Sequence, residues 1–324
     1  MSEKNSSRRN VALGSPTLHV VAENIPLAFY RAMKAVNDHG LEIRTQYDRK
    51  NKDGIFIDPP SKDAKVLVEI SNPFNQPRFP PLSYCELGKY IAEIMGVKDH
   101  LVVPINKLKE GIEKGKIDTK WPYTYHQRLC AYPSQNGSID QIETILDRLA
   151  KDLVTRRAVA STAIPEIDPF LKEDLPCLRE VHLRCTKDEN QIYLHMDTKW
   201  RSRDLYKAWH DNVIGLTFFQ DDLARRLGEK MGKEVKVGSY TDYSSSLHIY
   251  GQDYTEKGAD KFFENFSDEK SIIKRSWSSE KARDKLIVPQ LEDLLKEDYW
   301  KFPSSTKEYI TRLITNLKTG KYLP

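Results

Sequence analysis

Two short motifs place chemically useful groups where a buried core would not need them. In Leu175-Pro176-Cys177 a proline restricts the backbone directly before a cysteine, so the thiol can be aimed. In Arg156-Arg157 two guanidinium groups suit bidentate binding of a phosphate. An isolated cysteine is more often a buried small hydrophobe, and paired arginines are more often a solvated surface. The two motifs therefore indicate a nucleophile and an anion site only if further motifs in the sequence point to the same chemistry.

Two further motifs in the sequence carry groups suited to the same chemistry. Residues 200–212 place a guanidinium, a hydroxyl, a carboxylate and an amide at the end of a strand and the start of a helix: Arg201, Ser202, Asp204 and Asn212. In residues 246–250, alternation puts three polar side chains on one strand face: Ser246, His248 and Tyr250. The apolar opposite face is consistent with a strand that lines a wet pocket. An exposed strand edge would give the same pattern.

In their order along the chain these motifs resemble those of the thymidylate synthase and pyrimidine-nucleotide hydroxymethylase family. The shared series has six members: YTYHQRLCAY at 123–132, Asp140-Gln141, Arg156-Arg157, the LPC at 175–177, an Arg-Ser-x-Asp at 201–204 followed by Asn212, and a His-x-Tyr at 248–250. The resemblance covers roughly residues 120–255 well and 40–100 loosely. Six motifs at compatible spacing are far more specific than any one of them.

The chain also departs from the family pattern. The usual Cys-His pair is Cys177-Leu178, and the usual aspartate two residues before the histidine is Ser246. The Trp-Asn that commonly follows the arginine pair is replaced by residues 162–165. These departures resemble the divergent archaeal, phage and hydroxymethylase branches, and they leave the final product open.

The resemblance implies covalent catalysis on a pyrimidine nucleoside monophosphate. Cys177 would add to C6 of the base, which makes C5 nucleophilic toward the one-carbon unit of methylenetetrahydrofolate or a related pterin. Cationic neighbours would favour the thiolate. Asn212 would read the base edge, because a carboxamide can pair with uracil O4 and N3–H together. No metal is implied.

The remaining site residues are likewise carried over from the resemblance. The 5′-phosphate would be bound by Arg201 and Ser202 of one subunit, by Arg156 and Arg157 of its partner, and by Arg44. The sugar hydroxyl would be bound by His248 and Tyr250. The pterin would be held by Asp204 and an aromatic wall, for which the candidates are Trp121 and Trp209. Glu86 best matches the glutamate that organises water near the base, with Glu93 as a second candidate. An ordinary first-turn acid, stabilised by the helix dipole, is the alternative for Glu86.

Three functions follow as hypotheses. The first is a thymidylate synthase-type methyltransferase, with dUMP to dTMP as the preferred reaction. The second is a dUMP, dCMP or CMP 5-hydroxymethylase, in which water replaces hydride at the same residues. The third is a non-catalytic nucleotide- or RNA-binding relative, against which the thiol argues because a binding module needs none.

These residues require an α+β scaffold. Helical periodicity is present at 23–39, at 138–153 with Ser138 as the expected N-cap, and at 205–231. Strands are predicted at 55–57, 65–70, 181–185 and 192–200, and a strand, polar turn and strand at 236–250. We expect a large mixed sheet flanked by helices, which dimerises through a sheet face and shares its active sites. The expected divisions are a flexible leader (1–16), a catalytic domain (17–254) and a helical extension packed on it (255–324).

Composition bounds the remaining possibilities. The 324 residues are 39% hydrophobic and 30% charged, which is typical of a globular protein. A formal net charge of +4 does not require nucleic acid as a partner. No apolar run reaches the roughly 20 residues of a membrane span, and the first ten residues are polar. The four cysteines form no CxxC pair, so a zinc site is not expected. A cytoplasmic location is expected for the protein.

Overall fold

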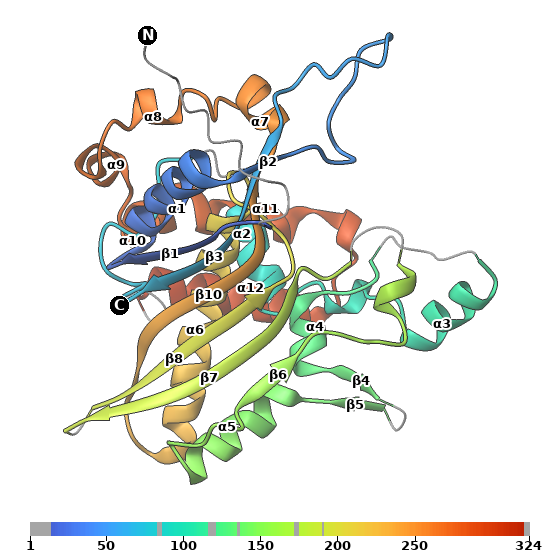
Figure 1. Ribbon diagram of the computed structural model, residues 1–324. Helices are drawn as coiled ribbons and strands as arrows, with labels where there is room; N and C mark the ends of the chain where they lie inside the picture. Colours follow the sequence, from blue (N-terminus) through green and yellow to red (C-terminus); the bar gives the residue numbers. More distant parts are fainter. Residues whose placement is uncertain are drawn as a thin grey trace.

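The computed structural model describes residues 14–82, 86–115, 121–134, 137–171, 175–189 and 191–320. The predicted leader therefore lies almost wholly outside the described residues. The centre is a mixed eight-stranded sheet in the order β1-β3-β10-β8-β7-β6, with β2 beside β3 and β9 beside β10 (Figure 1). Its strands are β1 (Thr17–Ala22), β2 (Leu41–Ile43), β3 (Ser61–Ile70), β6 (Val159–Ser161), β7 (Leu178–Asp188), β8 (Gln191–Trp200), β9 (Arg203–Asp204) and β10 (Val235–Ile249). A small hairpin is formed by β4 (Tyr132–Ser134) and β5 (Gly137–Ile139).

Twelve α-helices surround this sheet in the described part of the chain. Those before β10 are α1 (Ile25–His39), α2 (Leu87–Ile94), α3 (Ile105–Glu113), α4 (Tyr125–Cys130), α5 (Gln141–Lys151) and α6 (Trp209–Met231). Those after it are α7 (Gly251–Glu256), α8 (Phe262–Asn265), α9 (Glu269–Arg275), α10 (Ser279–Ala282), α11 (Val288–Lys296) and α12 (Ser304–Lys318). The predicted α+β class, a mixed sheet flanked by helices, is confirmed.

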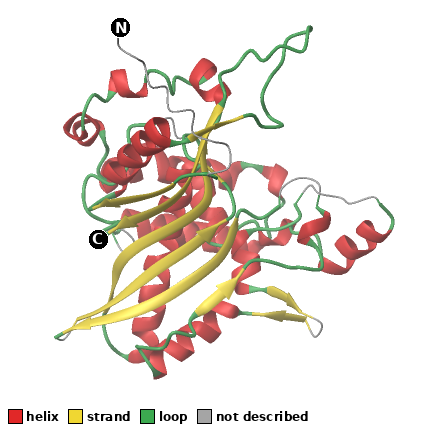
Figure 2. Ribbon diagram, viewed as in Figure 1, coloured by secondary structure: helices red, strands yellow, loops and turns green. Residues whose placement is uncertain are grey.

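The helices in the described part of the chain leave one face of the sheet uncovered. Alternate residues of β8 are buried, and α6 packs behind β8 and β10. No described helix lies in front of β7, β8 and β10 in Figure 2. The side chains on that front face, such as Tyr193 and His195 of β8, are partly exposed. The molecule therefore has a wide sheet surface on which a second protein chain could lie.

The central strand β10 differs from its prediction. Residues 236–250 alternate with a polar middle, which predicts two strands and a turn. Instead β10 runs unbroken through the sheet, because its backbone pairs with β3 on one side and β8 on the other, and register shifts after Val237 and Ser244 absorb local irregularity. A similar correction applies to α5, which begins after Asp140 rather than Ser138; the Asp140 carboxylate accepts from the Glu143 N–H at 2.8 Å.

The segment after β10 packs on the same core as the sheet. Leu291, Leu294 and Leu313 are buried in the cluster that also contains the sheet residues Leu183 and Met196. The domain boundaries themselves stay predictions. Within the described residues no helix combines the length and apolar character needed to cross a bilayer. In the same residues no three His, Cys, Asp or Glu side chains gather as metal ligands would.

Candidate active site

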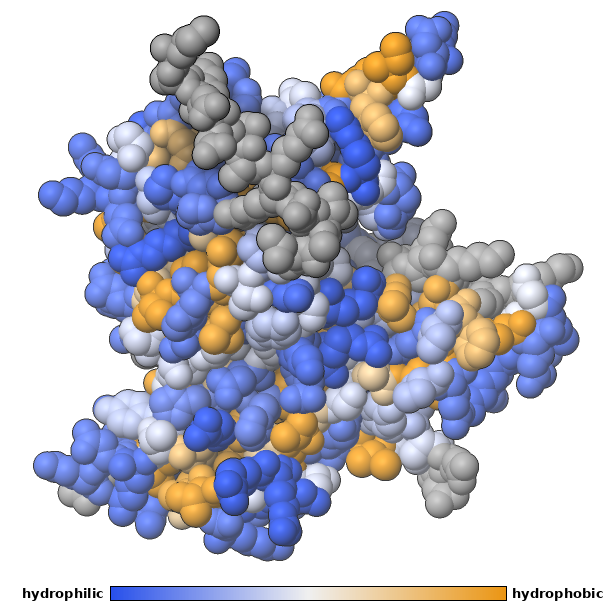
Figure 3. Space-filling model, in the orientation of Figure 1, coloured by the Kyte–Doolittle hydropathy of each residue, from blue (hydrophilic) through white to orange (hydrophobic). Residues whose placement is uncertain are grey.

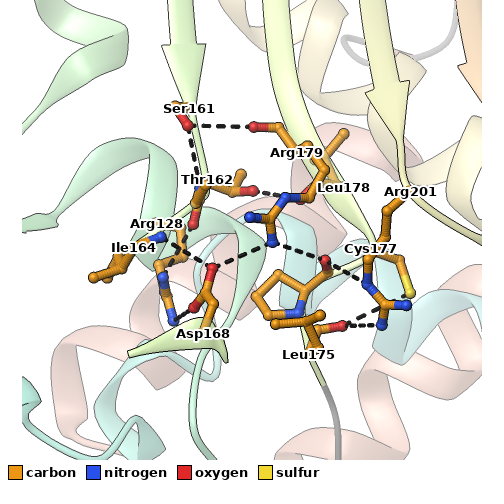
Figure 4. Close-up of polar contacts among 12 residues, drawn as sticks. Arg128, Ser161, Thr162, Ile164, Asp168, Leu175, Cys177, Leu178, Arg179 and Arg201 are labelled. Carbon is orange, nitrogen blue, oxygen red and sulfur yellow. Dashed lines mark hydrogen bonds and ion pairs between the residues drawn. The ribbon is translucent and has the colours of Figure 1, made fainter. Parts of the chain in front are cut away.

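Cys177 lies at the start of β7, in a turn held by Arg201 from the end of β8. The Arg201 guanidinium donates from Nε to the Pro176 carbonyl at 3.2 Å and from Nη2 to the Leu175 carbonyl at 2.6 Å (Figure 4). The Arg201 N–H also donates to the Cys177 carbonyl at 2.9 Å. The predicted nucleophile and the predicted phosphate arginine are thus neighbours. The Cys177 thiol in turn donates to the Leu175 carbonyl at 3.8 Å.

A second group of charges supports this turn from behind. Arg179 donates to the Pro176 carbonyl at 3.3 Å and to Asp168 at 3.2 Å. The buried Arg128 donates to the other oxygen of Asp168 at 3.1 Å. Sequence reasoning missed all three residues, because ion pairs between α4, the 162–171 loop and β7 have no signature in sequence. Burial lowers the pKa of the Arg128 guanidinium, and the neighbouring Asp168 carboxylate opposes that shift.

We expect Arg128→Met to lower the free energy of unfolding by about 3–5 kcal/mol, because it leaves a buried carboxylate with one cation fewer. Urea denaturation would measure this. The matched control is Arg312→Met on the exposed face of α12, expected to change stability by no more than about 0.5 kcal/mol. Equal losses in the two variants would show that the Arg128 pair has no special structural role.

Asn212, on the first turns of α6, is held on both sides. Its side-chain oxygen accepts from Arg203 Nε at 3.1 Å, and its amide nitrogen donates to the Tyr90 hydroxyl at 2.7 Å. Arg203 itself is buried, stacks 3.9 Å from the Trp200 ring and pairs with Asp242 at 2.8 Å. Among the residues that the structure describes, one N–H and one lone pair of the amide remain for a ligand. Neither Arg203 nor Tyr90 was identified from the sequence as a site residue.

Contacts connect Asn212 to Cys177. The Trp200 ring lies 5.7 Å from that of Tyr125, and the Tyr125 hydroxyl accepts from the Leu178 N–H at 3.3 Å, one residue after the cysteine. Burial raises the pKa of Tyr125 to about 12, so it remains a neutral phenol. The thiol, the guanidinium of Arg201 and the amide therefore border one region at the ends of β7, β8 and β9.

His248 and Tyr250, at the end of β10, lie on another side of the same region. Their ring centroids are 4.4 Å apart, and Asp204 of β9 pairs with His248 in register. Burial raises the pKa of the Asp204 carboxyl to about 6. Ser202 lies between Arg201 and β9 and is partly exposed. Six sequence-predicted residues are thus brought together with Cys177: Arg201, Ser202, Asp204, Asn212, His248 and Tyr250.

Arg44 lies on a projecting arm between β2 and β3, seen in Figure 1. Its guanidinium donates to the Asp58 carbonyl at 2.8 Å and lies 4.2 Å from the Phe56 ring. Residues 55–57, predicted as a strand, form only an isolated bridge between Phe56 and Lys50. Four large apolar or aromatic side chains on this arm are exposed: Tyr47, Ile55, Phe56 and Ile57. Figure 3 shows hydrophobic surface on the arm, behind its hydrophilic tip. Because the Tyr47 ring lies 5.6 Å from that of Tyr250, the arm borders the site.

The structure does not bring the other predicted residues to Cys177. Arg156 and Arg157 are exposed in the loop before β6. Glu86 is 66% exposed and pairs with Lys89 at 3.0 Å, as an ordinary acid at a helix start would. The other candidate glutamate, Glu93, pairs with Lys98.

The two tryptophans proposed for the pterin wall have different surroundings. Trp121 lies against Trp300 of the C-terminal segment, with ring centroids 5.9 Å apart. Trp209 is fully buried and donates to Asp242 at 3.1 Å. Trp209 is therefore a core residue, and its ring is not available to a pterin.

The fold and this cluster define an α+β protein with a cysteine-centred candidate active site bordered by arginines and an amide. Among known proteins, the chain is 28% identical over 233 residues to a protein of Methanosarcina mazei named "putative thymidylate synthase", covering 72% of this chain and 89% of that one. A protein of the same name from Methanocaldococcus jannaschii is 35% identical over 132 residues, which are 40% of this chain and 55% of the relative. The resemblance to the thymidylate synthase family drawn from the motifs is therefore confirmed.

No family model matches the chain. Among solved structures, the thermostable thymidylate synthase A from Bacillus subtilis aligns with a TM-score of 0.49 and 16% identity, covering 72% of this chain and 82% of that one.

Proposed function

We propose that the protein transfers a one-carbon unit to C5 of a pyrimidine nucleoside monophosphate, with dUMP to dTMP as the preferred reaction. The observation that carries the proposal is the grouping of Cys177, Arg201 and Asn212 around one region. These residues supply a nucleophile, a phosphate-binding cation and a group that reads a base edge. A binding protein would need the last two but not the thiol.

In this mechanism the Cys177 thiolate adds to C6, and C5 becomes the nucleophile. The free N–H and lone pair of Asn212 bind O4 and N3–H, which stabilises the enolate that forms. Arg201 and Ser202 hold the phosphate. A reduced folate, when bound, supplies the methylene group and the hydride. The buried carboxyl of Asp204 fits such a ligand because it can accept from pterin N–H groups.

The position of the arginine pair supports a shared site in a homodimer. Val159 pairs with His182, five residues beyond Cys177 on β7, and Arg157 lies further along. At about 3.3 Å per residue the arginine backbone is roughly 20 Å from the cysteine, beyond the reach of its own side chain. We therefore propose that Arg156 and Arg157 serve the partner's site. The uncovered sheet face supplies a surface for such a dimer.

The direct test is to incubate the protein with methylenetetrahydrofolate and each of dUMP, dCMP and CMP, and to determine the product by mass. A methylated dUMP product supports the proposal. A product heavier by one hydroxymethyl group instead identifies a 5-hydroxymethylase acting through the same residues. Binding of all three nucleotides without any product would leave a non-catalytic relative and overturn the enzyme assignment.

Asn212→Asp is expected to shift kcat/KM from dUMP toward dCMP by about ten- to a hundredfold. The site accommodates the change, because Arg203 can pair with the new carboxylate and the Tyr90 hydroxyl can donate to it. That carboxylate repels uracil O4 and accepts from the cytosine 4-amino group. An unchanged ratio would mean that Asn212 does not touch the base, and a wild-type preference for dCMP would refute the uracil assignment.

A further inference from the structure

A short hydrogen-bond relay runs from β3 to β10 and ends at His248. The Ser246 hydroxyl donates to the Asp63 carboxylate, and the same oxygen lies 3.2 Å from His248 Nδ1. Ser15 donates to the other carboxylate oxygen at 3.2 Å. Asp63 and His248 face each other in register across the two strands, and both are more than nine-tenths buried. The relay is thus part of the sheet, and the carboxylate and imidazole at its two ends are largely shielded from water.

The direction of each bond in this relay is determined by chemistry. An ionised carboxylate can only accept, so Ser246 must give its single hydroxyl proton to Asp63. Its oxygen then has only lone pairs to offer His248, so Nδ1 must carry the ring proton. The other ring nitrogen, Nε2, is left as an acceptor. Burial also lowers the pKa of His248, which keeps the ring neutral.

The Nε2 atom of His248 is the one end of the relay that lacks a hydrogen-bond donor among the described residues. It is also buried. A buried acceptor without a partner is unfavourable, and such atoms are uncommon in folded proteins. The Tyr250 ring beside it belongs to the candidate site. A hydrogen-bond donor on a ligand bound beside Tyr250 would satisfy this nitrogen.

We propose that Asp63 and Ser246 are positioning residues that fix His248 as a hydrogen-bond acceptor for the 3′-hydroxyl of the bound nucleotide. This inference rests on the proposed function and adds to it the direction of the sugar contact. The relay places a carboxylate behind the histidine from the neighbouring strand, where Ser246 stands in place of the aspartate expected at that position. The site thereby selects ligands whose 3′ substituent can donate a hydrogen bond.

The test compares Kd values for dUMP with those for its 3′-deoxy and 3′-fluoro analogues, neither of which can donate. The wild type should bind dUMP at least about tenfold more tightly than either analogue. Ser246→Ala should reduce this ratio to about threefold or less, because the ring can then adopt either tautomer, and it should leave the analogue Kd values nearly unchanged. Ser246→Thr, which keeps the hydroxyl, should restore the ratio. Ser244→Ala is the control, since the Ser244 hydroxyl is buried on the same strand and has no hydrogen-bond partner within the described ranges.

A structural defect would weaken the binding of all three ligands equally, whereas loss of the relay would weaken only the binding of dUMP, which carries the 3′-hydroxyl. Nitrogen NMR of His248 in the unmutated protein gives a second reading, with Nδ1 expected to be protonated. Equal binding of dUMP and its analogues by the wild type, or a proton on Nε2, would overturn the inference while leaving the proposed function standing. Failure to bind any of the three nucleotides would overturn the proposed function, and with it the assignment of the hydroxyl.

Discussion

Cys177→Ser is expected to reduce kcat by at least about 10⁴-fold while changing the Kd for dUMP by less than about threefold. The loss is large because a serine hydroxyl at neutral pH is a far weaker nucleophile than a thiolate. Binding should survive because the Leu175 and Pro176 carbonyls that hold the Arg201 guanidinium are unchanged in this variant. The measurement is turnover beside calorimetric titration of the nucleotide.

The matched control for that variant is Cys185→Ser on the same strand. Burial raises the pKa of the Cys185 thiol to about 11, so very little of it is ionised at neutral pH. Activity should therefore stay within about twofold of wild type. If Cys177→Ser retained even a tenth of wild-type turnover, or if both serine variants lost activity alike, Cys177 would not be the nucleophile.

Two inactive variants should regain activity when their subunits are exchanged. Arg156→Ala/Arg157→Ala lacks the arginine pair, and Cys177→Ser lacks the nucleophile. If each site takes its cysteine from one chain and its arginines from the other, a mixed dimer has one complete site and one with neither group. Random pairing of two equal pools makes half of the dimers mixed, so about a quarter of wild-type activity should appear.

The exchange experiment needs proof that subunits have mixed, which differently tagged chains and native mass spectrometry would supply. Each variant mixed with itself should stay inactive. Mixed dimers without regained activity would refute the shared site. If the arginine double variant were active by itself, Arg156 and Arg157 would have no part in phosphate binding.

Much of the scaffold could be predicted because it follows local patterns. The helix at 23–39 is found as α1 and the strand at 192–200 as β8, since one shows helical and the other two-residue periodicity. The prediction of two strands and a turn at residues 236–250 was wrong because polar residues in the middle of a strand pattern usually indicate a turn. Here pairing with a neighbouring strand on each side determines the structure instead. The N-cap of α5 was misplaced because Ser138 and Asp140 are equally good caps in isolation.

The candidate site was predictable only where its residues occur in short motifs. Cys177, Arg201 and Asn212 belong to such motifs, and the structure brings them together. Arg203 and Asp63 act through partners distant in sequence, so single-sequence reasoning had no signal for them. Glu86 was chosen by its place at the start of a helix, but that place leaves its side chain in solvent.

The hydrogen bonds of Arg201 also affect the entropy of substrate binding. An arginine side chain has about 2 kcal/mol of rotamer entropy to lose when it becomes ordered. Here two of its five N–H groups are already bonded to the Leu175 and Pro176 carbonyls, so most of that loss occurs when the chain folds. With respect to the described residues, three N–H groups remain for an anion. A phosphate that reaches this guanidinium therefore meets an ordered partner, and its binding energy is available for holding the base against the thiol.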